Sequence, residues 1–183
     1  LYMAEEAKKR GIDLAKDSKI RITWHTGEPG ASIPAMKKKL EGAFGAEVFD
    51  LPGLTELAAW GFSCTDHSGI VHVHEDYCLP EVLNLESGEP VGPGEEGELV
   101  MRGPQLFLGY YKRPELNAEV SLSGGWFRTG DMAVIDAEGY VKITGRRKEL
   151  IIRGGANISP AEIENVLSDD PRIRTLVIVG IPD

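Results

Sequence analysis

The side chains best suited to bind a metal ion lie in one short stretch of the chain. Both cysteines and three of the four histidines fall between residues 64 and 78, namely Cys64, His67, His72, His74 and Cys78. The two cysteines, together with His67 and His72, supply the ligand types of a tetrahedral Cys₂His₂ zinc site. Their spacing differs from that of a standard zinc finger, so scattered buried or surface residues are the alternative interpretation.

A second stretch, residues 125–164, combines charged groups with turn and helix signals. Its motifs are, in chain order, Arg128-Thr129-Gly130-Asp131, Glu138-Gly139, Arg146-Arg147-Lys148, Gly154-Gly155 and Ser159-Pro160-Ala161-Glu162. The first is an acidic turn, the second the tip of a hairpin, and the third a basic run. The fourth is a turn, and the fifth is a capping box that starts a helix. Taken alone, the basic run is a solvated turn.

Charge and composition limit the possible partners. The net charge of −9 over 183 residues argues against nucleic acid, because binding to the phosphate backbone relies on clustered positive charge. A nucleotide phosphate would therefore need a local basic patch. No apolar run is long enough to span a membrane, and the charged N-terminal residues lack the apolar core of a signal peptide. Two cysteines make no disulfide framework. A cytoplasmic protein without a membrane partner is expected.

The order of these motifs resembles that of the adenylate-forming, AMP-binding superfamily of acyl-CoA synthetases, adenylation domains and luciferases. Residues 125–164 correspond to the end of the large domain and the start of the small domain of that family. Three segments, Gly27-Glu28-Pro29, Gly53-Leu54-Thr55-Glu56 and His74 to Glu81, are most similar to phenylacetate–CoA ligase-like aryl-acid ligases. The resemblance implies ATP or AMP, Mg²⁺ and coenzyme A as cofactors, and a small carboxylic acid as substrate.

The first half of the chain would hold the adenine and the metal by this resemblance. The turn Gly27-Glu28-Pro29 would lie along the adenine ring, where glycine allows close backbone approach. The loop that follows runs from Asp50 through Gly53 to Glu56 and matches a nucleotide-binding motif. Its Pro52 stands where the family has an aromatic residue, which departs from the usual adenine stacking.

Within that loop the resemblance gives Thr55 and Glu56 catalytic roles. Thr55 would contact phosphate, and Glu56 would hold Mg²⁺, a hard cation suited to carboxylate oxygen. The alternative for Glu56 is a carboxylate at a helix start, stabilised by the helix dipole. For Gly27 the alternative is an ordinary turn.

The second half of the chain would hold the ribose and the phosphates. Asp131 matches the ribose-binding aspartate, whose carboxylate accepts hydrogen bonds from both vicinal hydroxyls. Arg146 matches an arginine whose planar guanidinium suits phosphate oxygens. Lys148 falls at the catalytic hinge on which the small domain turns. Gly154 and Gly155 resemble the turn beside the pantetheine channel. An aspartate in a strand turn, a solvated basic turn and a plain glycine turn are the alternatives.

Two kinds of secondary structure must position these residues. Strand signals at 20–26 and 48–49 flank a helix that is capped by Ser32, has Pro34 in its first turn and is closed by Gly45, an order typical of a parallel, doubly wound α/β sheet. Ligands sit at the carboxyl ends of such strands, where Gly27 and Asp50 fall. From Gly69 onward, short strands between Gly/Pro turns predict a small antiparallel β unit.

We therefore predict an α/β chain in three parts. Residues 1–68 are the end of a doubly wound sheet, 69–144 a β-rich subdomain, and 145–183 the start of an α+β C-terminal domain. In the last part, Ile163, Val166 and Leu167 should form the buried face of a helix, and residues 176–180 a strand.

The sequence favours an ATP-dependent carboxylic acid–CoA ligase that forms an acyl-adenylate and then an acyl-CoA, with phenylacetate as an example of an aryl substrate. The family's Ser/Thr/Gly-rich phosphate loop and its C-terminal Gly-Lys segment are missing, so an internal fragment that is inactive alone is expected. An adenylation domain that loads a carrier protein is one alternative. A non-catalytic nucleotide-binding or zinc-stabilised module is another. The sequence does not indicate an oligomeric state.

Overall fold

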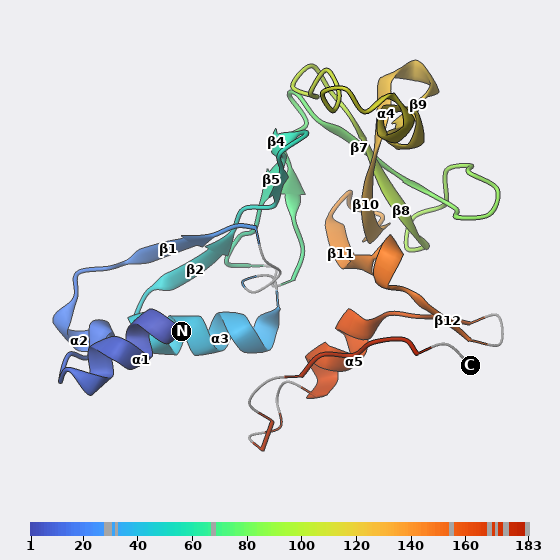
Figure 1. Cartoon of the computed structure of the whole chain (residues 1–183). Coiled ribbons are helices and arrows are strands. Elements are labelled where there is room, and N and C mark those ends of the chain that lie inside the picture. The colour runs from blue at the N-terminus through green and yellow to red at the C-terminus, as the bar shows by residue number, and fades with distance from the viewer. Residues whose placement is uncertain are drawn as a thin grey trace.

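The structure is a computed structural model, and it describes residues 1–27, 31, 33–66, 69–153, 156–167, 170, 172–173 and 176–181. Two strands and three helices form the described N-terminal part, an antiparallel sheet follows, and two short strands and a helix lie in the described C-terminal part (Figure 1). The mixed α/β fold that we expected is confirmed.

The N-terminal part is a small parallel α/β unit. Its elements are α1 Tyr2–Lys9, α2 Leu14–Asp17, β1 Ile22–His25, α3 Pro34–Phe44 and β2 Glu47–Asp50. Strands β1 and β2 pair in parallel, as the strand–helix–strand order predicts. Helix α3 is capped by Ile33 without a side-chain hydrogen bond, one residue later than predicted, and Ser32 lies outside the described residues. Gly45 ends α3 at a φ of 62°, which a side chain rarely adopts.

A curved antiparallel sheet forms the middle of the chain. Its strands are β7 Leu79–Leu83, β8 Glu96–Arg102, β9 Ser121–Leu122, β10 Trp126–Ile135 and β11 Val141–Arg146, in the order β11-β10-β8-β7 with β9 beside β10. Strands β10 and β11 form the predicted hairpin. The pairing of β10 with β8 shifts register between Arg128 and Met132, so a β-bulge bends the strand where Asp131 lies.

Short elements connect this sheet to the rest of the chain. Two small hairpins precede it, β3 Gly53–Leu54 with β4 Ala58–Ala59, and β5 Gly61–Phe62 with β6 His72–Val73. Helix α4, Pro114–Val120, and the 3-10 turn η1, Ser123–Gly125, lie between β8 and β10. Leu57 and Trp60 pack in the same core as Leu99, Met101 and Val141. The division at residues 68 and 69 stays a prediction, as does the division at Gly145.

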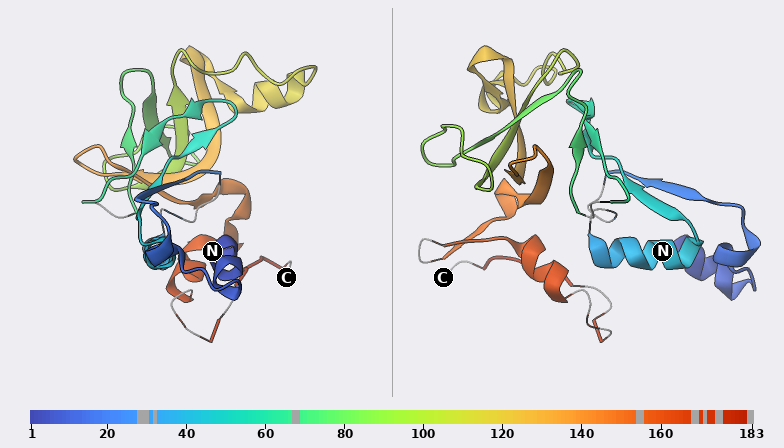
Figure 2. Two further views of the ribbon diagram at one scale, coloured as in Figure 1. Left: turned by 90° about the vertical axis from the view of Figure 1, so that its left-hand side faces the viewer. Right: turned by 180° about the vertical axis from the view of Figure 1, so that it is seen from behind.

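The C-terminal part follows β11 through the 3-10 turn η2, Arg147–Glu149. Strands β12 Ile151–Arg153 and β13 Ala156–Ile158 form a hairpin, and helix α5 spans Pro160–Leu167 (Figures 1 and 2). Ser159, predicted to cap α5, donates its hydroxyl to the carbonyl of Thr144.

Two expectations for the C-terminal part were wrong. The predicted buried face of α5 is exposed, at 37% for Ile163, 74% for Val166 and 39% for Leu167. Periodicity marks which face of a helix can be buried, but a neighbouring element must still cover it. Residues 176–180 are not a strand, and the N–H of Ile178 donates to the Glu164 carboxylate instead of to a neighbouring strand. Within the described residues, no helix combines the length and apolarity that a membrane crossing requires.

Candidate functional site

Glu56 lies in the turn of the β3–β4 hairpin, with Thr55 exposed beside it. The helix-start alternative for Glu56 is therefore excluded. The backbone carbonyl of Glu56 accepts the N–H of Phe107 at 2.9 Å, and its carboxylate Oε1 accepts the Tyr110 hydroxyl at 2.8 Å. Burial, then this hydrogen bond and the Glu56 charge, raise the pKa of Tyr110 to about 12.

The fit of Glu56 to magnesium can be judged from the donors around it. The described residues contain no group of three or more His, Cys, Asp or Glu side chains that could hold a metal ion. A Mg²⁺ ion in such a setting is bound through one or two carboxylates together with substrate phosphates and water. A single, partly buried carboxylate fits that mode, and Glu56 is the residue that would contact the ion.

The carboxyl ends of β1 and β2 carry the other predicted residues of the first half. Gly27 follows β1 with a φ of 83° and borders a groove together with His25, Thr26, Met36 and Leu40. Asp50 ends β2, is buried, and exchanges hydrogen bonds with Ser63 at 2.7 and 2.9 Å. Gly53 pairs with Ala59 in the β3–β4 hairpin. Glu28, Pro29, Gly154 and Gly155 lie outside the described residues.

Asp131 and Arg146 form an ion pair. They face each other in the β10–β11 register, and Arg146 Nε lies 2.8 Å from Asp131 Oδ1. Asp131 is 8% exposed, and burial raises its pKa to about 6, an effect that Arg146 opposes and the charge of Glu149 reinforces. The predicted ribose-binding and phosphate-binding groups therefore adjoin each other in one site.

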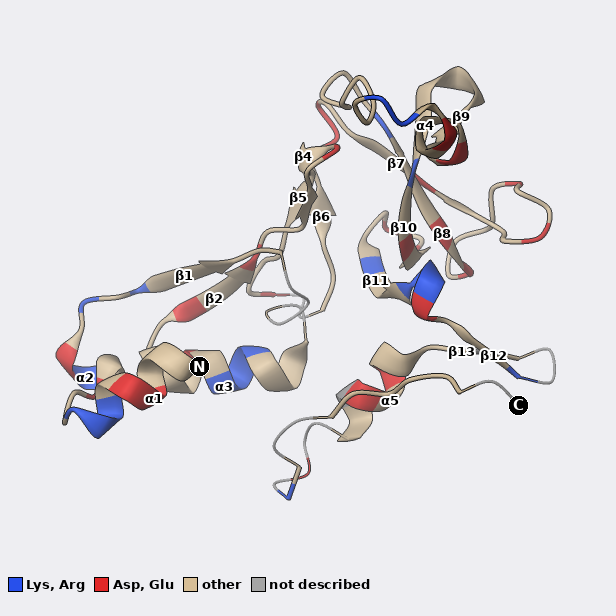
Figure 3. Cartoon of the chain, in the orientation of Figure 1, with Lys and Arg blue, Asp and Glu red and all other residues tan. Residues whose placement is uncertain are grey.

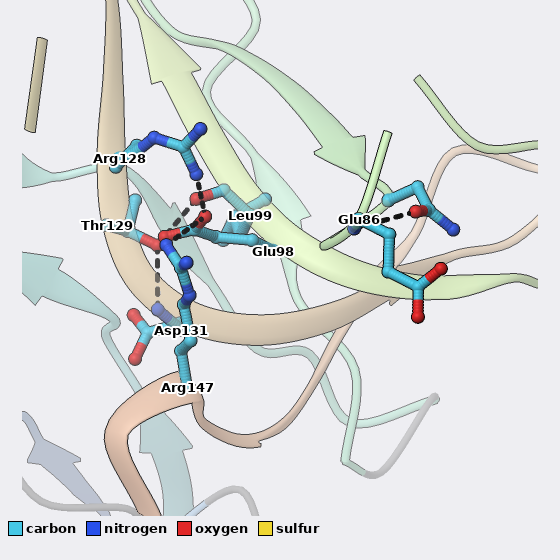
Figure 4. A network of polar contacts seen from close by, with 8 residues as sticks. Glu86, Glu98, Leu99, Arg128, Thr129, Asp131 and Arg147 are labelled. Carbon is cyan, nitrogen blue, oxygen red and sulfur yellow. Dashed lines mark hydrogen bonds and ion pairs between the residues drawn. The ribbon is translucent and has the colours of Figure 1, made fainter. Parts of the chain in front are cut away.

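A buried carboxylate, Glu98 of β8, supports this site from behind. It is 2% exposed and accepts from Arg128 of β10 and from Arg147 of η2, the latter at 3.0 Å (Figure 4). The Thr129 hydroxyl donates to the Leu99 carbonyl at 2.8 Å and accepts the Asp131 N–H at 3.0 Å. These contacts fix the bulged segment of β10 against β8.

The basic run predicted from the sequence spans the junction of β11 and η2. Arg146 is the last residue of β11, whereas Arg147 and Lys148 lie in η2 (Figure 3). Its three residues therefore differ in role, because Arg146 pairs with Asp131 and Arg147 with Glu98. Lys148 occupies the short turn that links the sheet to the C-terminal part. The run is not simply a solvated turn.

The predicted zinc ligands that the structure describes, Cys64, His72 and Cys78, do not form a metal-binding group. Cys78 is buried with its Sγ 3.4 Å from Met101 Sδ, and burial raises the pKa of its thiol. His72 stacks on Phe62 with ring centroids 5.2 Å apart, and Cys64 belongs to no metal-binding group among the described residues. His67 lies outside the described residues. The Cys₂His₂ arrangement is therefore not formed by the three ligands that the structure describes.

Comparison with known proteins identifies the family. The sequence model described as AMP-binding enzyme matches residues 3–111, which is more than half of the chain. The chain belongs to the AMP-binding enzyme family. The resemblance of this AMP-binding enzyme chain to the adenylate-forming superfamily is thereby confirmed.

Curated relatives of this AMP-binding enzyme chain are CoA ligases of several substrates. It is 42% identical to a 2-succinylbenzoate–CoA ligase of Geobacillus kaustophilus over 84% of the chain and 31% of the relative. A sulfoacetate–CoA ligase of Cupriavidus necator is 38% identical over 82% and 30%. A feruloyl-CoA synthase of an Amycolatopsis species is 50% identical over 53% and 20%. The chain thus spans under one third of the length of these relatives.

Solved structures agree with the sequence comparison. An O-succinylbenzoate coenzyme A synthetase from Bacillus subtilis, in complex with ATP and magnesium ion, has a TM-score of 0.78 at 27% identity, over 100% of this chain and 38% of that one. ATP-bound MatB from Rhodopseudomonas palustris has a TM-score of 0.69 at 29% identity, over 82% and 30%.

Sequence reasoning did not single out Glu98, Tyr110 or the pairing of Arg147. The position of Glu98 within the predicted apolar strand around Leu99 could have indicated it. A glutamate in a buried strand needs a charged partner. Tyr110 gave no such local signal, since its contact with Glu56 joins residues 54 positions apart.

Proposed function

We propose that the full-length protein that carries this chain is an ATP-dependent carboxylic acid–CoA ligase. The observation that carries the proposal is the Asp131–Arg146 pair beside the buried Glu98 network, in a chain of the AMP-binding enzyme family. The relatives named above as CoA ligases and the ATP-bound structures support it.

The proposed reaction has two steps. A substrate carboxylate oxygen attacks the α-phosphorus of ATP, forming the acyl-adenylate and releasing pyrophosphate. The CoA thiolate then attacks the acyl carbon, forming the thioester and releasing AMP, while the thiol proton passes to solvent. Catalysis in such reactions rests on positioning and on stabilisation of charge around phosphorus.

Each site residue has a proposed role in these steps. The Asp131 carboxylate accepts hydrogen bonds from the ribose hydroxyls, and Arg146 swings from Asp131 toward phosphate oxygens. Thr55 donates its hydroxyl to phosphate. Glu56 would hold Mg²⁺, which would neutralise phosphate charge when bound. Lys148, in the turn between the sheet and the C-terminal part, is the pivot between the two steps.

Further groups of this site are proposed from the sequence resemblance. Gly27, Glu28 and Pro29 line the adenine, and Asp50 and Gly53 shape the loop that holds Thr55. Gly154 and Gly155 flank the thiol arm of CoA.

For the substrate we propose an aryl carboxylic acid. Two relatives, named for feruloyl and succinylbenzoate substrates, support this class, whereas those named for sulfoacetate and fatty acids define the competitors. Phenylacetate is one member of the class to be tested.

The test is ATP–pyrophosphate exchange by the full-length protein over a panel of aryl, fatty and sulfonated acids. Exchange stimulated by aryl acids is expected, with CoA then converting the adenylate to a thioester. Transfer of the acyl group to a carrier protein but not to free CoA would show that the acceptor is a carrier protein. Exchange with no acid in the panel, in a folded protein that binds Mg²⁺–ATP, would overturn the ligase proposal.

A further inference from the structure

A tyrosine from a distant loop holds the carboxylate of the proposed magnesium ligand. Resting on the proposed function, we propose that Tyr110 is a positioning residue, which orients Glu56 toward the magnesium ion on the nucleotide. The contact joins the β3–β4 hairpin to the loop before α4. Glu56 is thereby attached to this loop through both its side chain and its backbone.

The contact with Glu56 is made by the phenol hydroxyl. Tyr110 donates to Glu56 Oε1 at 2.8 Å, and the nearby N–H of Phe107 donates to the Glu56 carbonyl at 2.9 Å. The two bonds fix the backbone and one carboxylate oxygen at once. Leu57, the next residue, is fully buried in the main core, which anchors the hairpin turn.

Tyr110 is itself held rigidly. Asn117 of α4 accepts the Tyr110 N–H at 2.6 Å and donates to the Tyr110 carbonyl at 3.0 Å. The Phe107 ring meets the Tyr110 ring edge-on, with centroids 4.8 Å apart. Gly109 makes room for the amide: its φ is 127°, and an added Cβ would lie 3.0 Å from Asn117 Oδ1. Because Tyr110 is held in place, its hydroxyl restricts the orientation of the Glu56 carboxylate.

This arrangement suits a carboxylate that must meet a cation. A carboxylate has two oxygens, each with lone pairs to offer, and Tyr110 uses Oε1. Among the described residues no hydrogen bond or ion pair reaches Oε2 of Glu56, so that oxygen can point to a hard cation. Residues that hydrogen-bond to metal ligands orient them, and their loss weakens metal binding.

The competing explanation is that the phenol merely fastens one loop to another. Both explanations predict some loss of stability when the hydroxyl is removed. Only a positioning role predicts weaker metal binding in a variant that is still folded, so metal affinity separates the two.

The test compares Tyr110→Phe with Tyr111→Phe in the full-length protein. The second variant makes the same chemical change at the adjacent residue, whose side chain is 84% exposed. Mn²⁺ binding is measured by electron paramagnetic resonance with a non-hydrolysable ATP analogue present. Free Mg²⁺ at half-maximal ATP–pyrophosphate exchange is measured in parallel, with thermal unfolding as the check on folding.

Loss of the hydrogen bond that orients the metal ligand should weaken Mn²⁺ binding by Tyr110→Phe roughly ten- to a hundredfold. Tyr111→Phe should match the wild type, and Glu56→Gln should weaken binding at least as much as Tyr110→Phe. Asn117→Asp keeps the acceptor for the Tyr110 N–H but loses the donor to its carbonyl, so it should show a smaller effect of the same sign. It replaces Tyr110→Phe if that variant does not fold.

Wild-type Mn²⁺ affinity in Tyr110→Phe, together with weakened binding in Glu56→Gln, would overturn the proposal and leave Tyr110 as a loop fastener. An unchanged affinity in Glu56→Gln would overturn it too, because no metal ligand would remain to be oriented. Absence of exchange in the wild type, with Mn²⁺ binding still weakened by Tyr110→Phe, would reject the ligase activity and leave the positioning role standing.

Discussion

Replacing Asp131 by asparagine should stabilise the protein near neutral pH, although it removes a proposed ligand of ribose. Asp131 is 8% exposed, and its ion pair with Arg146 does not compensate for this burial, because the net effect raises the pKa from 3.8 to about 6. Asparagine resembles the protonated aspartic acid in shape and charge. The difference in unfolding free energy between this variant and the wild type therefore measures the cost of a charged carboxylate at position 131.

The sign and size follow from proton linkage. Below pH 3.8 the carboxyl is protonated in both states and the two proteins should be equally stable. Between pH 3.8 and about 6 only the unfolded state loses its proton, so the wild type loses stability as pH rises. Above that range the difference levels off at about 3 kcal/mol in favour of Asp131→Asn, from about two pKa units at about 1.4 kcal/mol each.

Urea unfolding of the full-length protein, followed by tryptophan fluorescence from pH 4.5 to pH 8, measures this difference. Glu138→Gln, at the exposed tip of the β10–β11 hairpin, is the control for loss of one negative charge. Asp131→Asn should gain stability relative to wild type as pH rises, whereas the control should not. If Asp131→Asn were less stable at pH 8 than at pH 5 relative to wild type, the ion pair would outweigh burial and our reasoning would be refuted.

Two further predictions concern the sheet behind the site. Glu98→Gln should lower the free energy of unfolding by about 1–3 kcal/mol, because two guanidinium groups lose a buried carboxylate. Arg147→Met should lower it by less than about 1 kcal/mol, because Arg147 is half-exposed. Urea unfolding checks both, and equal losses would contradict the assignment. Gly97→Ala should destabilise by about 1–3 kcal/mol, because its Cβ would lie 2.3 Å from the Leu83 carbonyl oxygen. In the same assay Gly42→Ala, in α3 with open space around it, should stabilise by up to about 1 kcal/mol, and a loss at both glycines would point to a general effect of the added methyl.

Local signals in the sequence were sufficient for many elements. Gly45 predicts the end of α3 because its backbone adopts a conformation that other residues avoid. The alternating residues on either side of Glu138 and Gly139 predict the β10–β11 hairpin, and the structure confirms it. The family assignment, too, followed from short motifs in a fixed order.

Contacts between distant residues could not be predicted in this way. The sequence presented Asp131 and Arg146 as two separate ligand groups, and only the strand register shows that they pair. Spacing in sequence suggested a zinc site, but His72 of β6 packs against Phe62, whereas Cys78, just before β7, packs against Met101. The apolar stripe of α5 was visible in the sequence, whereas its exposure among the described residues was not.

The sharing of Glu98 between two arginines has a consequence for motion. If η2 moves away from the sheet, Arg147 passes into water from a half-exposed position, and Glu98 keeps Arg128 as its partner. No buried charge is left uncompensated, so separation of η2 carries a small energetic penalty. Dissolved salt screens the contact of half-exposed Arg147 more than that of the more enclosed Arg128, so higher ionic strength would favour separation of η2. The Glu98 carboxylate would thus keep a charged partner if η2 detached from the sheet.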